Sequence, residues 1–376
     1  MIDAATAVIM VGPGGRSPLE QLVSAAQRAA ALDLIDTLSV AGIGKIIVAA
    51  PAGDWLPARP GLIRDDDPPG EPFHFGRRLA GIITGHNLDQ VLYFGGASAP
   101  LFPGDMVDLL CGLLHSRRDE PVALTNNRHS SDWVGFTQAQ RALDILADVD
   151  RDNGLAWLLE NRADYDVRVL AALRPSAGMD IDTPTDLAVL ALHPELKPRL
   201  AAVLSSELAA PIRRIPLGAV VEIAAREESQ LVLIGRVAPL AWQALNQATR
   251  IWIRVYSEER GMVASGRVKR GEVRSLPGMV LERDGPAAFF ATLAALGDAA
   301  IIDSRVLMAH HGYWPGPADR FASDTFDVEA IQDPWLRDFT AAAARAPIPV
   351  VLGGHGLVSG GLYTLAEILK ARRADG

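Results

Sequence analysis

The sequence predicts an α/β protein with a mostly parallel β-sheet, followed by a second, smaller α/β domain. Short runs rich in Val, Ile and Leu recur along the chain, and stretches of helical length separate them. These runs are continuously apolar rather than alternating, which is typical of parallel strands covered by helices on both faces. The chain has 376 residues, more than one hydrophobic core usually serves, so two domains are expected.

The first strand is predicted at residues 7–11, and a glycine-rich turn follows it. Apolar side chains then recur at intervals of three and four over residues 17–40, which predicts a helix with one buried face. Gly42 and Gly44 end this helix, because glycine tolerates the positive φ found at helix C-termini. The next strand is predicted at 45–49.

Residues 51–72 are rich in Pro, Gly and Asp and are predicted to form a long irregular loop. Beyond this loop the alternation of helix and strand resumes. The remaining predicted elements of the first half are helices at 74–85 and 105–116 and strands at 90–94, 122–125, 133–136 and 167–170. Together they place the first domain at residues 1–205.

A second set of strand and helix patterns begins after Pro198. Its predicted strands lie at 231–234, 251–256, 299–303 and 349–352, and its helices near 240–246, 286–296, 335–345 and 362–372. These elements predict a second α/β domain at residues 206–376.

Composition limits the classes of function. The chain carries 36 Lys and Arg against 45 Asp and Glu, a net charge of −9, so no sequence-wide basic field is available to bind nucleic acid. No apolar run approaches the ~18 residues of a membrane-spanning helix, and the N-terminus lacks the basic segment of a signal peptide. Cys111 is the single cysteine, which excludes an intramolecular disulfide. A cytoplasmic protein without membrane or nucleic-acid partners is expected.

The turn after the first strand contains Gly12, Gly14 and Gly15, with Arg16 next. Glycines at a strand–helix junction let backbone N–H groups approach a phosphate, and the positive end of the helix dipole attracts it. Arg16 would add a charged fork. The alternative is an ordinary tight turn, since Pro13 removes one donor and the spacing matches neither a P-loop nor a dinucleotide fingerprint.

The segment Asp-Ile-Asp-Thr-Pro-Thr-Asp-Leu begins at Asp180. Thr183 is a good helix N-cap, Pro184 suits the first helical position, and Asp186 belongs in the acidic first turn. Capping does not require Asp180 and Asp182. In an extended stretch these two side chains point to the same side, where paired carboxylates can hold a Mg²⁺ ion that bridges phosphates.

This segment resembles the closing motif of the MobA-like nucleotidyltransferases, the group of molybdenum-cofactor and 2-phospho-L-lactate guanylyltransferases. Residues 91–101 resemble the family's strand followed by a Gly-Asp-x-Pro-Leu turn, and the resemblance covers about residues 5–195. It implies a GT-A-like Rossmannoid fold, an NTP substrate, and Mg²⁺- or Mn²⁺-dependent transfer of a nucleotidyl group to a small phosphorylated acceptor. Asp180 and Asp182 would then hold the metal, while the loop through Arg16 would hold the NTP.

Two departures from the family pattern keep alternatives open. The turn at residues 96–99 reads Gly-Ala-Ser-Ala, without the metal-binding aspartate, and no lysine follows Arg16. Losing such groups removes transition-state stabilisation, so a catalytically degraded nucleotide-binding or scaffold protein is one alternative. A GT-A glycosyltransferase that uses a nucleotide sugar is another, although the Asp-x-Asp motif usual in the middle of such domains is absent.

Further polar residues of the first domain are candidate nucleotide contacts. Asn126, Asn127 and Asp132 follow a predicted strand, where α/β sheets commonly bind ligands, and Asp132 is a substitute for the missing metal ligand. Ser98 belongs to the turn that resembles the family's. The alternative for residues 126–132 is an ordinary turn built from turn-forming residues.

The second domain offers another candidate site. Residues 353–361 contain five glycines between a strand and a helix, so His355 and Ser359 are candidate contacts for an anion, unless the glycines only relieve crowding. Asp303 ends a predicted strand. If it meets Asp324 and His355 in space, the three would form a metal or acid–base site, and the chemistry would reside in this domain.

Overall fold

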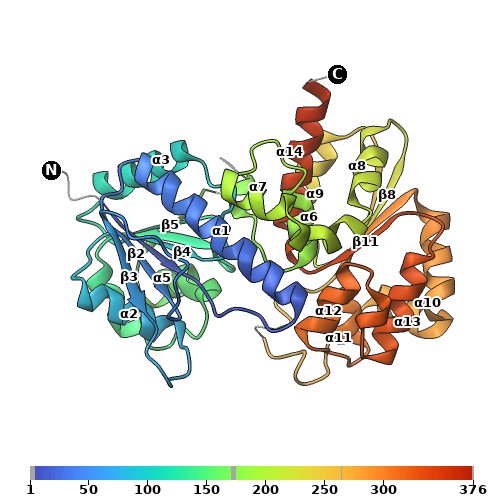
Figure 1. The fold of residues 1–376 in the computed structure, drawn as a ribbon, viewed down its shortest axis with the longest axis horizontal. Helices are drawn as coiled ribbons and strands as arrows, with labels where there is room; N and C mark the ends of the chain where they lie inside the picture. Colours follow the sequence, from blue (N-terminus) through green and yellow to red (C-terminus); the bar gives the residue numbers. More distant parts are fainter. Residues whose placement is uncertain (1–4, 171–174, 264, 375–376) are drawn as a thin grey trace. The chain divides into compact units, whose positions relative to one another are not determined.

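The computed structural model describes residues 5–170, 175–263 and 265–374 (Figure 1). The chain forms two compact units. Unit 1 comprises residues 1–13, 27–180 and 197–200, and unit 2 comprises residues 14–26, 181–196 and 201–376.

Unit 1 is built on a seven-stranded sheet with the order β3-β2-β1-β4-β6-β5-β7. Only β6 runs antiparallel to its neighbours, so the predicted mostly parallel sheet is confirmed. The strands are β1 (Thr6–Met10), β2 (Ile46–Ala50), β3 (Leu62–Asp66), β4 (Val91–Gly95), β5 (Val122–Thr125), β6 (Trp133–Phe136) and β7 (Asp166–Val169). The helices are α1 (Pro18–Val40), α2 (Phe75–Gly85), α3 (Gly104–Ser116), α4 (Leu143–Leu146) and α5 (Leu155–Ala163).

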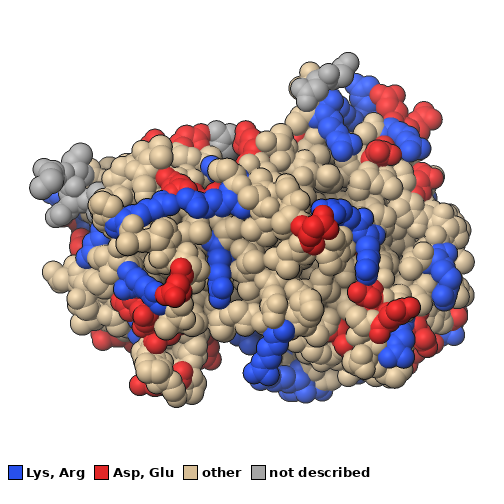
Figure 2. Space-filling view, viewed as in Figure 1, with Lys and Arg blue, Asp and Glu red and all other residues tan. Residues whose placement is uncertain are grey.

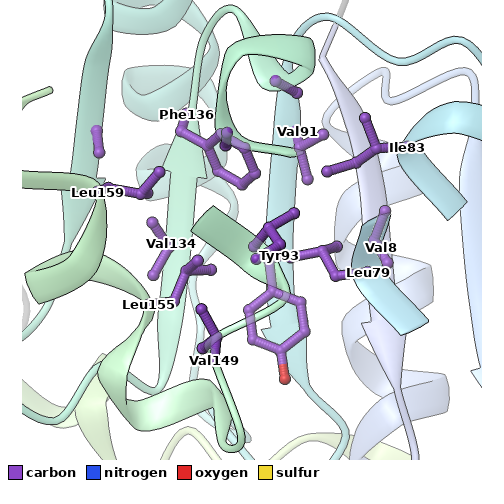
Figure 3. Close-up of a cluster of buried hydrophobic side chains, with 14 of the residues drawn as sticks. Val8, Leu79, Ile83, Val91, Tyr93, Val134, Phe136, Val149, Leu155 and Leu159 are labelled. Carbon is purple, nitrogen blue, oxygen red and sulfur yellow. The ribbon is translucent and has the colours of Figure 1, made fainter. Parts of the chain in front are cut away.

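Both faces of this sheet are buried. In β1, Val8 and Met10 face a layer that contains α2, α4 and α5, whereas Ala7 and Ile9 face α1 and α3. Figure 3 shows the first layer, in which Tyr93 lies among aliphatic side chains from the sheet and the helices. Burial on both faces explains why these strands carry continuous apolar runs.

Unit 2 has a smaller sheet of four parallel strands, in the order β11-β10-β8-β9. Its strands are β8 (Gln230–Gly235), β9 (Trp252–Ser257), β10 (Ala299–Asp303) and β11 (Val350–Gly353). Its helices are α6 (Pro184–Leu190), α8 (Leu217–Ala225), α9 (Pro239–Ala248), α10 (Leu276–Leu296), α11 (Ser304–His310), α12 (Pro317–Asp324), α13 (Pro334–Ala344) and α14 (Gly360–Ala374), and α7 (Pro198–Ser205) passes into it from unit 1. Helices α10 to α13 cover one face, and α6, α8, α9 and α14 lie on the other.

Several local predictions need correction. The loop predicted at 51–72 contains β3, an edge strand whose polar, half-exposed residues hide it from a search for apolar runs. The helix predicted at 286–296 is the second half of α10, which is kinked at Gly285, where φ is 77°. Helices α11 and α12 were not predicted. Each spans only about two turns, too short for a clear period.

Figure 2 shows the charged side chains on one face of the molecule. On the face shown in Figure 2, the described Lys and Arg side chains are interspersed with Asp and Glu side chains. Within the described residues, no helix has both the length and the apolar character needed to cross a membrane.

Candidate functional site

A pocket of about 1220 Å³ opens at the carboxyl ends of the strands of unit 1. It is lined by the chain after β1, β2 and β3, by Tyr93 of β4, and by residues 150–153. The chain leaves β1 through α1 toward β2 and later returns to β4 on the other side of β1. Such a switch point is where open α/β sheets bind ligands. The volume is slightly above the range of about 300–1,000 Å³ typical of small-molecule sites.

The glycine-rich turn divides into two parts. Gly12 lines the pocket of unit 1, and a Cβ added there would meet no atom within 4 Å, so a ligand could approach its backbone closely. Gly14, Gly15 and Arg16 belong to unit 2. There the Gly15 N–H donates to Ser24 Oγ at 2.9 Å, and a Cβ on Gly15 would lie 2.1 Å from Glu20 Cβ.

The start of α1 satisfies its own donors. The Ser17 N–H donates to the Glu20 carboxylate at 2.9 Å, and the Glu20 N–H donates to Ser17 Oγ at 3.3 Å. The Arg16 side chain is exposed, and its carbonyl accepts a hydrogen bond from Gln21. Gly15 therefore has a local role in packing, as the alternative of an ordinary turn expects.

Tyr93 marks the floor of the pocket. Its ring is buried in the core, while its hydroxyl oxygen points out of the cluster (Figure 3) and donates to Asp152 Oδ2 at 3.0 Å. Burial raises the pKa of Tyr93 well above its usual value, and the carboxylates of Asp152, Asp180 and Asp132 add to the effect. One neutral hydroxyl of β4 thus donates to Asp152, and the charges of Asp180 and Asp132 also act on it.

Ser98 ties these segments together. Its buried Oγ donates to the carbonyls of Gly95 and Asp132, both at 2.8 Å. Ser98 also forms an isolated antiparallel bridge with Asp180. A single serine therefore joins the end of β4 to the segments that carry two of the three carboxylates, which gives it a positioning role.

Asp152 is the residue of this group that the sequence did not indicate. It lies in a short 3₁₀ helix (Asp152–Gly154) within an acidic stretch that reads as a solvated surface. A Cβ built on Gly95 would lie 3.3 Å from Asp152 Oδ2. The Asp152 carboxylate therefore lies beside the turn that carries no acid of its own.

Asn126 and Asn127 shape the neighbouring loop. Asn126 Oδ1 accepts the Asp132 N–H at 3.0 Å, and its amide donates to the Asp132 carboxylate. Asn127 Oδ1 accepts the N–H groups of His129 at 3.0 Å and Ser130 at 3.3 Å. Both amides thus have local roles in fixing the position of Asp132.

The donor chemistry of the acidic group suits a hard cation. Among the described residues, no three or more His, Cys, Asp or Glu side chains are already arranged around a metal position. Mg²⁺ usually binds one or two protein carboxylates and completes its octahedron with water and substrate phosphates. A Mg²⁺ ion at Asp132, Asp152 or Asp180 would therefore need water or substrate phosphates for most of its ligands.

Asp182 belongs to unit 2, at the start of α6. The predicted capping of this helix is confirmed: Thr183 is the N-cap, Pro184 follows it, and Asp186 completes a capping box. The Asp182 side chain is exposed, and its N–H donates to Asp186 Oδ2 at 3.1 Å. Asp186 is buried, and burial together with the charge of Asp182 raises its pKa to about 7.

The predicted acidic group of unit 2 is occupied by arginines. Asp303 accepts two hydrogen bonds from the Arg236 side chain, at 2.6 and 3.0 Å. Asp324 accepts two from Arg305, at 2.7 and 2.6 Å. Burial opposes ionisation of Asp303, but Arg236 outweighs it and lowers the pKa, whereas burial raises the pKa of Asp324 despite Arg305. The charge of Asp303 raises the pKa of Asp324 further and opposes the lowering of the pKa of His355.

Two of the glycines of residues 353–361 lie close to side chains of α6. A Cβ on Gly353 would lie 3.2 Å from Thr185 Cβ, and one on Gly356 would lie 3.0 Å from Asp186 Oδ1. Ser359 Oγ donates to the His355 carbonyl at 2.9 Å, so this hydroxyl stabilises the loop itself.

No protein-family model and no curated protein matches the sequence. Among solved structures, the chain is similar to a cytidylyltransferase from Leptospira borgpetersenii, at 14% identity and a TM-score of 0.38 over 54% of this chain and 94% of the other. It is also similar to 2-C-methyl-D-erythritol 4-phosphate cytidylyltransferase from Thermus thermophilus, at 13% identity and a TM-score of 0.34 over 56% of this chain and 99% of the other. A protein from Desulfovibrio desulfuricans, provisionally named a nucleotide-diphospho-sugar transferase, gives 14% identity and a TM-score of 0.37 over 58% and 97%.

Proposed function

We propose that unit 1 binds a nucleoside triphosphate with Mg²⁺ and transfers its nucleotidyl group to a small phosphorylated acceptor. In this reaction an acceptor phosphate oxygen forms a bond to the α-phosphorus, the α–β phosphoanhydride bond breaks, and pyrophosphate leaves. The observation that carries the proposal is the position of Asp152, which accepts a hydrogen bond from Tyr93 at the switch point of the sheet, with the segments of Asp132 and Asp180 joined to the end of β4 through Ser98. Carboxylates that hold a metal bound to substrate phosphates are the usual protein share of such chemistry.

The pocket supplies both signs of charge that this substrate needs. Arg77 and Arg151 line it, and Gly12 offers open backbone at the end of β1. Arg78 also lines the pocket, but it is engaged by Asp65 at 2.8 Å and Asp67 at 2.9 Å. Guanidinium groups contact phosphate oxygens, while the carboxylates hold the metal.

Mg²⁺ would neutralise charge on the phosphates and on the leaving pyrophosphate. Asp152 and Asp180 would hold it, with Asp132 as the third acid of the group. Tyr93 keeps its proton at neutral pH because its pKa is raised, so its hydroxyl orients Asp152 by donating a hydrogen bond to it. The roles of Asp182 and Arg16 in metal and phosphate binding, which the family resemblance implies, remain proposals, and Asp182→Asn and Arg16→Gln would test them in the assay below.

The first test is thermal stabilisation of the full chain by ATP, GTP, CTP and UTP, with and without Mg²⁺. A ligand at 100 times its Kd stabilises the native state by about 2.7 kcal/mol. One NTP is expected to stabilise the protein only when Mg²⁺ is present, and Asp152→Asn and Asp180→Asn to remove the effect. Asp148→Asn is the matched control, because Asp148 lies in the same acidic stretch but pairs with Arg162 at 2.8 Å on the surface.

The outcomes separate the competing functions. Release of pyrophosphate on addition of phosphorylated acceptors supports transfer. Nucleotide binding without turnover favours the degraded nucleotide-binding or scaffold protein, and stabilisation by a nucleotide sugar alone favours the glycosyltransferase. If no nucleotide changes the melting temperature of the wild type, the proposal for unit 1 is wrong.

A further inference from the structure

The pocket of unit 1 contains an exposed aromatic ring, Phe73, to which the proposed reaction gives no role. Its exposed fraction is 63%, and it lies in the segment between β3 and α2. Among the exposed large apolar side chains of the described residues, Phe73 is the one that lines this pocket. Phe75 and Tyr93 also line it, but both are buried and pack against each other in a T-shaped pair, with ring centroids 5.0 Å apart. Of these three rings, Phe73 is the one that a ligand can cover.

The segment that carries Phe73 is anchored where it begins. Arg78 of α2 donates to Asp65 Oδ1 at 2.8 Å and to Asp67 Oδ1 at 2.9 Å, and the Asp67 N–H donates to the Ala50 carbonyl at 2.9 Å. Three of the five residues that connect Asp67 to Phe73 are prolines, which fix φ and limit the conformations of the segment.

The segment is anchored again directly after Phe73. His74 is the N-cap of α2 in an extended conformation, with φ of −135° and ψ of 112°. Its Nδ1 accepts the Arg77 N–H at 3.3 Å, and its Nε2 lies 3.2 Å from Asp150 Oδ1. Both ends of a proline-rich segment are therefore held, so Phe73 is placed in the pocket before a ligand arrives. A group placed in this way loses little conformational entropy on binding.

The backbone at the start of α2 has few donors left for a phosphate. The Gly76 N–H donates to the Val149 carbonyl at 2.9 Å, the Arg77 N–H donates to the His74 ring, and the Arg78 N–H donates to the His74 carbonyl at 3.0 Å. These are N–H groups that a helix N-terminus would otherwise offer to an anion. The side of the pocket next to Phe73 therefore suits an uncharged, flat part of a ligand better than its phosphates.

We propose that Phe73 stacks on the nucleobase of the nucleoside triphosphate. This inference rests on the proposed function, and it assigns the base to the side of the pocket formed by residues 68–77. A phenyl ring offers a base an apolar face and a π-system, and such stacking accepts any of the four bases. Phe73 and Asp152 line one cavity of about 1220 Å³, which is large enough for a whole nucleotide whose phosphates lie near the carboxylate.

The test is isothermal titration calorimetry of the full chain with ATP, GTP, CTP, UTP and inorganic tripolyphosphate, each with Mg²⁺. Phe73→Ala is expected to raise the Kd of the NTP that the wild type binds by between about 5- and 150-fold, the range that base–aromatic stacking supplies. It should leave the Kd of tripolyphosphate unchanged, because this probe has no base. Phe73→Trp should keep the NTP affinity. The emission of its added tryptophan, taken as the difference from the wild type, should be quenched by the NTP and not by tripolyphosphate.

Trp157→Ala is the matched control, because Trp157 is an exposed aromatic residue of α5 in the same unit and lies outside the pocket lining. It should leave both Kd values unchanged. An NTP Kd that is equal in Phe73→Ala and the wild type overturns the stacking role and leaves the nucleotide site in place. An equal loss for the NTP and for tripolyphosphate also overturns it, because a change in the shape of the pocket would then explain the result. If the wild type binds none of the four NTPs, the proposed function itself fails, and this inference fails with it.

Discussion

Asp186 is buried and His355 half-buried in unit 2, and their pKa values are displaced in opposite directions. Burial and Asp182 raise the pKa of Asp186 from 3.8 to about 7, while burial and Arg236 lower that of His355 from 6.5 to about 4. Between pH 4 and 6.5, native Asp186 keeps a proton that the unfolded chain has lost, and native His355 lacks one that the unfolded chain holds. Asp186 makes the free energy of unfolding fall with rising pH and His355 makes it rise, so the two slopes oppose each other.

Replacing either Asp186 or His355 removes its contribution to the pH dependence of the unfolding free energy, so that the contribution of the other residue can be measured. One proton difference is worth about 1.4 kcal/mol per pH unit. Relative to the wild type, Asp186→Asn is expected to gain about 2 kcal/mol of unfolding free energy between pH 4.5 and 6.5. His355→Gln is expected to lose about 2 kcal/mol over the same interval. Both differences are taken against the wild type at each pH, so contributions from groups common to the proteins cancel.

The assay is urea unfolding followed by tryptophan fluorescence at pH 4.5, 5.5 and 6.5, at constant ionic strength. Asp338→Asn, which changes an exposed acid on α13, is the control and should run parallel to the wild type. If the unfolding free energies of Asp186→Asn and His355→Gln also change with pH in parallel with the wild type, the opposite titration of Asp186 and His355 is refuted.

Three further substitutions test packing and pairing, each by urea unfolding. Gly96→Ala places a Cβ 2.7 Å from Val11 Cα and should lower the unfolding free energy by about 1–3 kcal/mol; an unchanged value would show that the turn can move. Tyr93→Phe removes a hydrogen bond to a carboxylate and should lower the unfolding free energy by about 1–3 kcal/mol. An unfolding free energy equal to that of the wild type would contradict this expectation. Arg305→Met leaves the buried Asp324 without its counter-charge and should cost about 3–5 kcal/mol, most of it recovered when Asp324→Leu is added; no recovery would count against the pairing.

The strands buried on both sides were predictable from sequence, whereas the charged edge strand β3 and the short helix α11 were missed. Strands β1 and β10 are buried along their whole length and appear as unbroken apolar runs. Strand β3 mixes Leu62 and Ile63 with three charged residues, and its edge position exposes part of it. All but one residue of α11 are buried, so it lacks the polar face that reveals a helix.

The candidate site was predictable only where chemistry and local pattern coincide. Ser98, Asp132 and Asp180 each follow a recognisable strand or precede a capped helix, and the structure joins their segments through hydrogen bonds. Asp152 has no such context. Its place depends on a hydrogen bond from Tyr93, 59 residues earlier, and no local spacing encodes a contact of that range.

The position of Asp152 bears on whether the missing turn aspartate means lost activity. When the Gly-Asp-x-Pro-Leu pattern is aligned on Pro100 and Leu101, Ser98 falls at the aspartate's place. The Ser98 hydroxyl is buried and donates to two carbonyl oxygens. An aspartate at this position would place carboxylate oxygens beside those carbonyl oxygens, and neither can donate a hydrogen bond to the other. Any acid acting in its place would have to come from another segment, and the Asp152 carboxylate lies 3.3 Å from where a Gly95 Cβ would be. Loss of the turn aspartate accordingly does not by itself favour a degraded protein over an enzyme with a relocated carboxylate.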